Sequence, residues 1–289
     1  MGFEDFLNAL VSGLLLGGFY AALAVGVTIA FGMIDVVNIA HPAFIIMSAF
    51  IVFFLTGGVG IDPLIAGLIL MPAAFVLGRI IYKFYHHTFE RKHDDSLQGL
   101  AFFFGLLFCI EVGLVLAVGA DFRFVSAPYI DTNWSIGFLD LQGRYLVPCL
   151  ASLAMVVAVQ VFLDRTYVGR AILAVSQDPT ALRLVGGNPV RIKEIAFGLS
   201  LATAAFAGAL LILIQPVEPS IGRELIGRAF AICVLGGMTS IRGTVIAAAL
   251  LGVCESLTMT FWSASWAPAI AFGLLLTALA FKPTGLLRR

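Results

Sequence analysis

Charged residues are scarce in this chain. Only 12% of its 289 residues are Asp, Glu, Lys or Arg, whereas 61% are hydrophobic, and the mean hydropathy is +1.04. A soluble domain carries about 25% charged residues. The composition therefore excludes a soluble globular protein and predicts that most of the chain faces lipid or other membrane-spanning helices. The formal net charge is zero, which argues against nucleic acid as a partner.

Motifs for nucleotide and metal chemistry are missing as well. None of the four lysines follows a glycine, so the chain has no P-loop, and it has no H-E-x-x-H. The cysteines stand singly in apolar runs, where thiols pack as small hydrophobic groups: Cys109, Cys149, Cys233 and Cys254. We expect no metal site, no cofactor bound by this chain and no enzymatic activity. If ATP drives the protein, a separate subunit must bind the ATP and its Mg²⁺.

Long apolar runs predict the membrane-spanning helices, since a span needs about twenty apolar residues. Seven runs are clear candidates: Phe6–Phe31, Leu64–Tyr85, Leu100–Val118, Tyr145–Leu163, Ile195–Ile214, Gly243–Phe261 and Ala267–Phe281. Two shorter runs cover Pro42–Thr56 and Leu225–Met238. The sequence therefore predicts an all-α polytopic membrane protein with about eight or nine spans, two of them short or broken.

Both short runs follow a long helix through a polar, Gly- and Pro-containing connector. The connectors are Gly32–Pro42 and Gln215–Glu224. Interrupted helices at corresponding places in two halves of a chain are typical of inverted-repeat transporters, whose binding region lies at the breaks. We therefore expect the translocation pathway at Asn38 and His41 in the first connector and at Pro219 and Gly222 in the second. Ordinary surface loops are the alternative, with Asn38 acting only as a helix cap.

The distribution of basic residues predicts the orientation. Thirteen of the seventeen Lys and Arg residues fall on one side of the predicted spans, which the positive-inside rule assigns to the cytoplasm. That side includes the C-terminus and the Arg-rich loop 164–194. If both short runs cross, nine spans place the N-terminus outside; if one or both only dip into the membrane, the number falls to eight or seven.

Two acidic residues, Glu111 and Glu255, lie inside predicted spans. Ionised groups in lipid are costly and usually face the bundle interior, a cavity or a partner. These residues support an alternative function, a proton- or ion-coupled secondary transporter. A G-x-S fragment ending at Ser200 raises a weaker alternative, an intramembrane hydrolase, but no base lies near it in the sequence. Arg223 in the second connector and Arg228 just after it provide charge near the outer side, where we expect them to meet a periplasmic partner or to extend to the interface.

Several ordered blocks resemble one family, the permease subunits of branched-chain amino acid ABC importers. The blocks are Tyr20–His41, Gly169–Asn188, Pro219–Glu255 and the ending K-P-T-G-L-L. The resemblance implies an inverted-repeat permease domain over 1–289, with loop 164–194 as the cytoplasmic coupling loop and 119–144 as a periplasmic loop. It also implies location in the bacterial inner membrane.

The resemblance further implies a heteromeric importer. Its other parts would be a second homologous permease, two cytoplasmic ATPases and a periplasmic binding protein. The coupling loop would present a short amphipathic helix to an ATPase, with these positions matching the family: Arg170, Ala171, Gln177, Asp178, Ala181, Gly186 and Gly187. Glu255 would join the pathway residues. Expected substrates are branched-chain or other hydrophobic amino acids, or a related small metabolite such as urea, a short amide or a small carboxylate.

Overall fold

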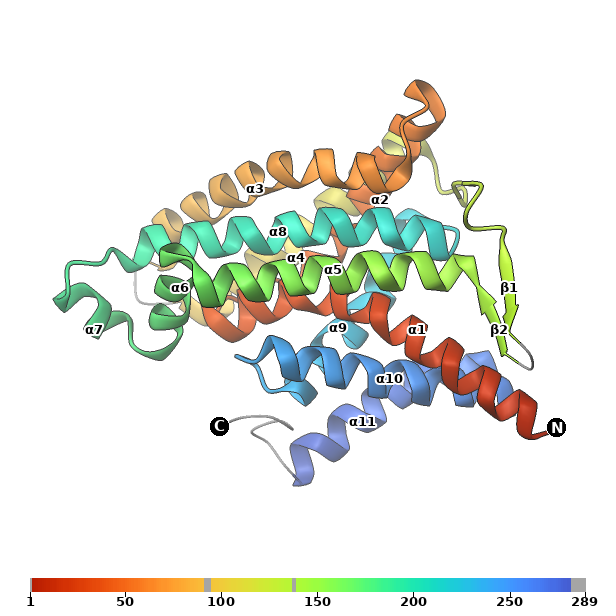
Figure 1. The fold of residues 1–289 in the computed structure, drawn as a ribbon. Helices are drawn as coiled ribbons and strands as arrows, with labels where there is room; N and C mark the ends of the chain where they lie inside the picture. The colour runs from red at the N-terminus through yellow and green to blue at the C-terminus, as the bar shows by residue number, and fades with distance from the viewer. Residues whose placement is uncertain (1, 91–94, 137–138, 282–289) are drawn as a thin grey trace.

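The computed structural model describes residues 2–90, 95–136 and 139–281. These residues form a helical bundle (Figure 1). Its long helices are α1 (Phe3–Val27), continued by the π-helix η1 (Thr28–Met33), α2 (His41–Val59), α3 (Pro63–Thr88), α4 (Asp95–Val118), α5 (Gly143–Arg165), α8 (Pro189–Ile214), α10 (Ile241–Phe261) and α11 (Ala267–Phe281). The shorter helices are α6 (Tyr167–Gln177), α7 (Pro179–Leu184) and α9 (Gly222–Gly236), with 3₁₀ turns η3 (Pro219–Ile221) and η4 (Ala264–Trp266). A hairpin pairs β1 (Asn133–Ile136) with β2 (Leu139–Gln142).

Eight helices in the described part of the chain are long and apolar enough to cross a membrane. The predicted polytopic all-α class is therefore confirmed. One of the two short runs belongs to α2, which has 19 residues and is long enough to span. The other forms α9, which has only 15 residues.

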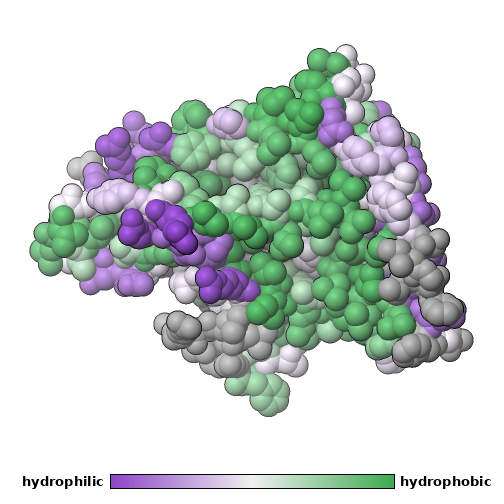
Figure 2. Space-filling view, in the orientation of Figure 1, coloured by the Kyte–Doolittle hydropathy of each residue, from purple (hydrophilic) through white to green (hydrophobic). Residues whose placement is uncertain are grey.

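The two ends of the bundle differ in structure. Figure 1 shows α6 and α7 at one end, and the β1–β2 hairpin and the N-terminus at the other. Figure 2 shows a hydrophobic belt between these ends, with hydrophilic residues gathered at both. That distribution is expected for a multi-pass membrane protein. Part of the basic tally (Arg91, Lys92, Lys282, Arg288 and Arg289) and the block K-P-T-G-L-L lie outside the described residues.

Helix α8 forms the centre of the bundle and is buried along nearly its whole length. Glycines let its neighbours approach closely. A Cβ at Gly78 of α3 would lie 2.9 Å from the Gly198 Cα of α8, and a Cβ at Gly208 would lie 2.9 Å from the Ala49 nitrogen of α2. Small residues serve this purpose in lipid, where the hydrophobic effect does not drive helices together.

A further close backbone contact joins α1 to α10. A Cβ at Gly13 would lie 2.6 Å from the Val253 Cα, and a Cβ at Gly17 would lie 2.6 Å from the Ala249 Cα. The G-x-x-x-G face of α1 thus packs against the small-residue face of α10 that contains Gly252. The two ends of the sequence are held together by backbone contact.

This contact predicts a position-specific effect of added side-chain volume. Gly17→Val should lower the melting temperature of the detergent-solubilised protein, because overpacking a tight contact typically costs about 1–3 kcal/mol. Gly105→Val in α4 is the matched control, since a Cβ there meets nothing within 4 Å. Equal melting temperatures for the two variants, measured by thermal unfolding, would contradict the α1–α10 contact.

Candidate translocation pathway and coupling surface

The first connector turns back into the bundle. After η1 ends, Asp35 adopts a left-handed conformation with φ of 58°, and the chain runs without regular structure until α2 begins at His41. The His41 ring packs directly on Gly26 of α1. Gly26 lies seven residues before Met33, where η1 ends. The connector therefore folds back along η1 to the end of α1, by more than one helical turn. Irregular backbone at this depth occurs only where protein covers it or a cavity is lined.

Asn38 and His41 are both buried and incompletely paired. Asn38 is 2% exposed and His41 is fully buried. Among the described residues, neither polar atom of the Asn38 side chain nor the His41 Nε2 has a hydrogen-bond partner. The capping interpretation of Asn38 is wrong, because the N-cap of α2 is Ala40 and Pro42 occupies the first turn. Unpaired buried polar groups cost about 1–3 kcal/mol each, so plain packing does not account for them.

Ser200 lies beside His41, an arrangement that the sequence did not predict. Its Oγ donates to the Gly26 carbonyl at 2.7 Å and is 3.5 Å from His41 Nδ1. The serine hydroxyl therefore fastens α8 to α1. This bond directs the hydroxyl proton to a backbone carbonyl, away from the imidazole, which does not favour a nucleophilic role.

The second connector also enters the bundle, from the opposite end. Val217 exchanges two backbone hydrogen bonds with Arg123, at 2.9 and 2.8 Å. The buried Pro219 then opens the turn η3, and α9 begins at the buried Gly222. A Cβ at Gly222 would lie 3.6 Å from the Pro42 backbone. The first turns of α2 and α9 therefore meet inside the bundle, although about 180 residues separate them in the sequence.

Glu255 is part of a buried ion pair. Its Oε1 accepts from Arg228 Nε at 3.0 Å and its Oε2 accepts from Tyr20 Oη at 2.5 Å. The Arg228 side chain is 13% exposed and that of Glu255 is fully buried. The cluster fastens α9 to α1 and α10. Arg228 was expected to meet a periplasmic partner or to extend to the interface, but its side chain is buried within the bundle, so that expectation is wrong. Glu255 is a paired carboxylate within the bundle.

Glu111 has an arginine partner too. Arg223, in the first turn of α9, donates from Nε to Glu111 Oε2 at 3.0 Å and from Nη2 to Oε1. Each of the two carboxylates expected to face the bundle interior, a cavity or a partner thus has a guanidinium from α9 as its partner. Sequence spacing gave no sign of either pair, since 112 residues separate Glu111 from Arg223. A paired carboxylate is a poor carrier of a coupling proton, which weakens the secondary-transporter alternative.

The predicted coupling loop forms two helices instead of one. Helix α6 ends at Gln177, and Pro179 begins α7. The break has a local cause, because Asp178 Oδ1 caps α7 by accepting from the Thr180 and Ala181 backbone nitrogens at 2.8 and 3.0 Å. The helix α7 ends before Gly186, which has φ of +85°.

The coupling-loop residues divide into an inner and an outer set. Ala171 packs inward, whereas Arg170, Gln177, Asp178, Ala181 and Gly186 are exposed and Gly187 is half-buried. Leu184 and Val185 are 85% and 81% exposed. These two neighbouring aliphatic side chains at the tip of a polar loop form an apolar surface that the described residues leave uncovered.

A cavity of about 430 Å³ lies between this loop and the two broken segments of the bundle, the first being η1 with its connector and α2, and the second being the second connector with η3 and α9. One wall is the end of η1 from Phe31 to Asp35, and a second is Val175, Ser176 and Pro179 of the coupling loop. The third is the end of α9 with Met238 and Thr239. At its edge Gly32 contacts the Met238 backbone so closely that a Cβ at Gly32 would overlap it. The two broken segments thus meet here as well as at Pro42 and Gly222.

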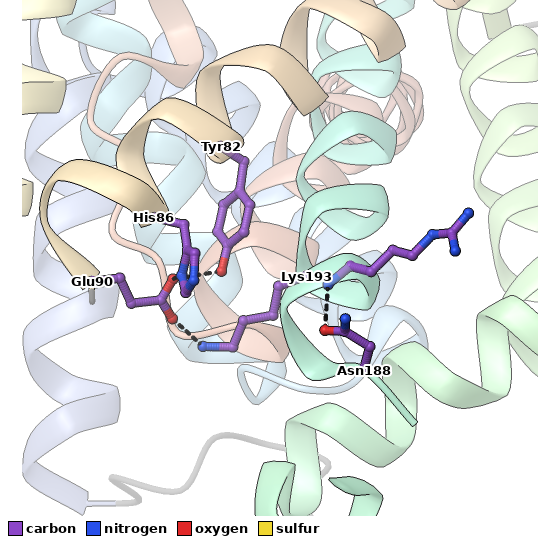
Figure 3. Close-up of polar contacts among 6 residues, drawn as sticks. Tyr82, His86, Glu90, Asn188 and Lys193 are labelled. Carbon is purple, nitrogen blue, oxygen red and sulfur yellow. Dashed lines mark hydrogen bonds and ion pairs between the residues drawn. The ribbon is translucent and has the colours of Figure 1, made fainter. Parts of the chain in front are cut away.

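An ion-pair cluster closes the same end of the bundle (Figure 3). Lys193 of α8, which also lines the cavity, donates to Glu90 Oε1 at 2.7 Å. Glu90 Oε2 contacts Tyr82 Oη at 2.6 Å and His86 Nδ1 at 2.7 Å. Burial alone would raise the pKa of the Glu90 carboxyl, but these hydrogen bonds outweigh it and hold the pKa below its usual value. Their stabilising effect is therefore present at neutral pH and is lost only as the pH falls through that lowered pKa.

The buried Arg228–Glu255 pair predicts a large loss of stability when one partner is removed. Arg228→Gln leaves the Glu255 carboxylate without a cation, and such a change costs about 3–5 kcal/mol. Arg242→Gln is the control, since Arg242 is 79% exposed and lies 4.0 Å from Asp164; exposed pairs contribute about 0–1 kcal/mol. Thermal unfolding of both variants in detergent measures the difference. An Arg228→Gln protein as stable as the control would contradict the buried pair.

Comparison with known proteins identifies the family. Residues 9–279 match the family model described as the permease component of the branched-chain amino acid transport system. The chain is 28% identical over 300 residues to the high-affinity branched-chain amino acid transport system permease protein LivH of Escherichia coli (strain K12), covering 99% of this chain and 97% of LivH. It is 28% identical over 298 residues to BraD of Pseudomonas aeruginosa, covering 98% and 96%.

A second type of permease is related over part of the chain. LivM of Escherichia coli (strain K12) is 35% identical over 153 residues, covering 51% of this chain and 36% of LivM. A solved structure, PsaBC from Streptococcus pneumoniae in complex with Fab, superposes with a TM-score of 0.51 and 12% identity, covering 98% of this chain and 94% of that chain. At that identity the likeness concerns the fold alone. The family match, which spans nearly all the helices, shows that the chain belongs to the permease components of branched-chain amino acid transport systems and is a transport subunit, not an enzyme.

Proposed function

We propose that the chain is one of two permease subunits of an ABC importer in a bacterial inner membrane. Its cargo would be branched-chain or other hydrophobic amino acids, or a related small metabolite such as urea, a short amide or a small carboxylate. The family match and the full-length likeness to LivH and BraD support the role. The partial likeness to LivM supports a homologous second permease as partner.

The two ends of the bundle offer surfaces for the remaining partners, the ATPases and the substrate-binding protein. At the α6–α7 end, loop 164–194 would dock one of two cytoplasmic ATPases, which bind ATP and Mg²⁺. The exposed Leu184 and Val185 suit burial in a groove on that ATPase. At the opposite end, the periplasmic loop 119–144 and its hairpin would face a substrate-binding protein. In this proposal, residues 1–289 act as a single permease domain with a cytoplasmic C-terminus.

The main support for a coupling mechanism is the cavity that the coupling loop and both broken segments line together. The coupling loop, the end of η1 and the end of α9 all line it. When ATP binding draws the ATPases together, a shift of α6 and α7 would reach both broken segments through these walls. The same segments meet again at Pro42 and Gly222. A movement at the cytoplasmic end is thereby linked to the predicted pathway residues Asn38, His41, Pro219, Gly222 and Glu255, as coupling between two sites requires.

The direct test is ATP-driven uptake of radiolabelled leucine by the intact importer reconstituted in proteoliposomes with its binding protein. The proposal expects uptake that needs ATP on the ATPase side. Uptake that persists without ATP and follows an imposed proton gradient would overturn it and favour the secondary transporter.

If α7 docks the ATPase, a substitution on its exposed surface should impair ATPase stimulation and leave the stability of the permease unchanged. Leu184→Glu should abolish stimulation of ATP hydrolysis by the loaded binding protein, because it puts a charge where an apolar groove must close. Thermal stability of the variant permease should be unchanged, since Leu184 is 85% exposed. Leu97→Glu is the matched control: Leu97 is 79% exposed and lies in the first turn of α4, outside the coupling loop. Full stimulation in the Leu184→Glu complex would contradict docking at α7.

A further inference from the structure

The Arg223 side chain is exposed on the surface of the bundle, although its partner Glu111 lies well inside the end of a long helix. Its side chain is 56% exposed, whereas that of its partner Glu111 is 10% exposed. Glu111 lies seven residues before the end of α4 at Val118, which is about 10 Å below that end at 1.5 Å per residue. Gly222, next to Arg223, contacts Pro42 inside the bundle. The guanidinium is therefore on the surface of the described part of the chain, about two helical turns inside the end of a candidate membrane span.

A charged group at this depth is strongly disfavoured in lipid. Translocon-based scales put the cost of Arg at the centre of a span at about 2.5–3.5 kcal/mol, and intramembrane Arg residues almost always face a protein interior or a water-filled cavity. The pair with Glu111 lowers this cost but leaves half of the Arg223 side chain uncovered. The face of the bundle formed by α4 and α9 is thus unsuited to lipid around Arg223.

The geometry around Arg223 favours contact with an anion. Glu111 lies behind the guanidinium and holds it by two of its nitrogens. The Phe108 ring lies 5.3 Å below the guanidinium carbon and stacks with the cation. This leaves a fixed guanidinium edge directed outward, and the planar fork of Arg matches a carboxylate in bidentate fashion.

We propose that the α4–α9 face lines the water-filled passage, and that Arg223 receives the carboxylate of the transported molecule there. The inference rests on the proposed function and, among the cargoes proposed there, on those that carry a carboxylate, the amino acids and small carboxylates. Glu111 acts as the resident counter-ion: it keeps the guanidinium neutralised while the passage is empty and shares it with the cargo carboxylate in transit. Arg223 is thus a specificity-determining residue that favours anionic groups over cationic ones.

The helical repeat of α4 provides a matched pair of probes. At 100° per residue, Phe104, Phe108 and Glu111 lie on one face of the helix, and Cys109 lies about 160° from Glu111. Phe108 and Cys109 are both exposed. If the α4–α9 face is in contact with water and the opposite face meets lipid, a thiol at 108 and the native thiol at 109 differ in their access to water-soluble reagents.

The first experiment measures this access in the intact importer in native membrane vesicles. Phe108→Cys is made with the native cysteines replaced by alanine, and a second protein keeps only Cys109. The probe is the membrane-impermeant cation trimethylammonium-ethyl methanethiosulfonate. We expect the thiol at 108 to react at least about tenfold faster than Cys109. Equal rates at both positions would overturn the assignment of this face to the passage.

The second experiment tests the charge of Arg223. The anionic sulfonatoethyl methanethiosulfonate is compared with the cationic reagent at position 108. One elementary charge at about 6 Å changes the rate ratio of two oppositely charged reagents by roughly tenfold in bulk water, and by more in less polar surroundings. Arg223→Gln and the neutral double variant Glu111→Gln/Arg223→Gln should lose the preference for the anion, whereas Glu111→Gln and Arg223→Lys should keep it. An unchanged ratio in the double variant, which leaves no unpaired charge to disturb folding, would overturn the role of Arg223.

Failure of this inference is distinguishable from failure of the proposed function. Leucine uptake is measured in the same vesicles for the Phe108→Cys complex. ATP-driven uptake together with an unreactive thiol at 108 would remove the role of the α4–α9 face and leave the importer assignment intact. Loss of ATP dependence in the unmodified complex would remove the importer assignment itself.

Discussion

The structure depends on how four charged side chains are placed within an apolar bundle. Helix α9 is too short to span by itself and starts inside the protein, where it packs against α1, α2, α10 and α11. Its two arginines add ion pairs to this packing: Arg228 with Glu255 of α10, and Arg223 with Glu111 of α4. Because an unpaired charge at this depth is costly, each pair resists separation, and the short helix is held on two sides.

This anchoring gives the molecule two junctions between its broken segments. One lies in the bundle, where Gly222 contacts Pro42, and the other lies at the coupling end, where Gly32 contacts Met238. Between them, η1 and α9 connect a cavity beside the coupling loop with the buried, incompletely paired side chains of Asn38 and His41. Backbone contacts at glycine are rigid, since no side chain can adjust within them. The arrangement suits a protein in which a shift of the helices at one end must move the segments inside the membrane.

Hydrophobic run length predicted nearly all of the helices, because lipid imposes a fixed length on any span. Connector composition likewise located both breaks. Contacts across the bundle were not predictable: nothing in the sequence near Glu111 or Glu255 points to Arg223 or Arg228, and side-chain pairing over such separations depends on the packing of whole helices. The resemblance to the family implied one short amphipathic helix in the coupling loop, whereas the Asp178-Pro179 cap divides it into two. Leu184 lies exposed among the described residues.

The central claim is that this permease works only as part of a larger, ATP-driven assembly. The most direct measurement is affinity purification of the tagged chain from native membranes in mild detergent, with the co-purifying chains identified by mass spectrometry. The account predicts recovery of a cytoplasmic ATPase and of a second, related permease in equal amount to the tagged chain. Recovery of the chain alone or only with copies of itself, with no nucleotide-binding subunit, would contradict it.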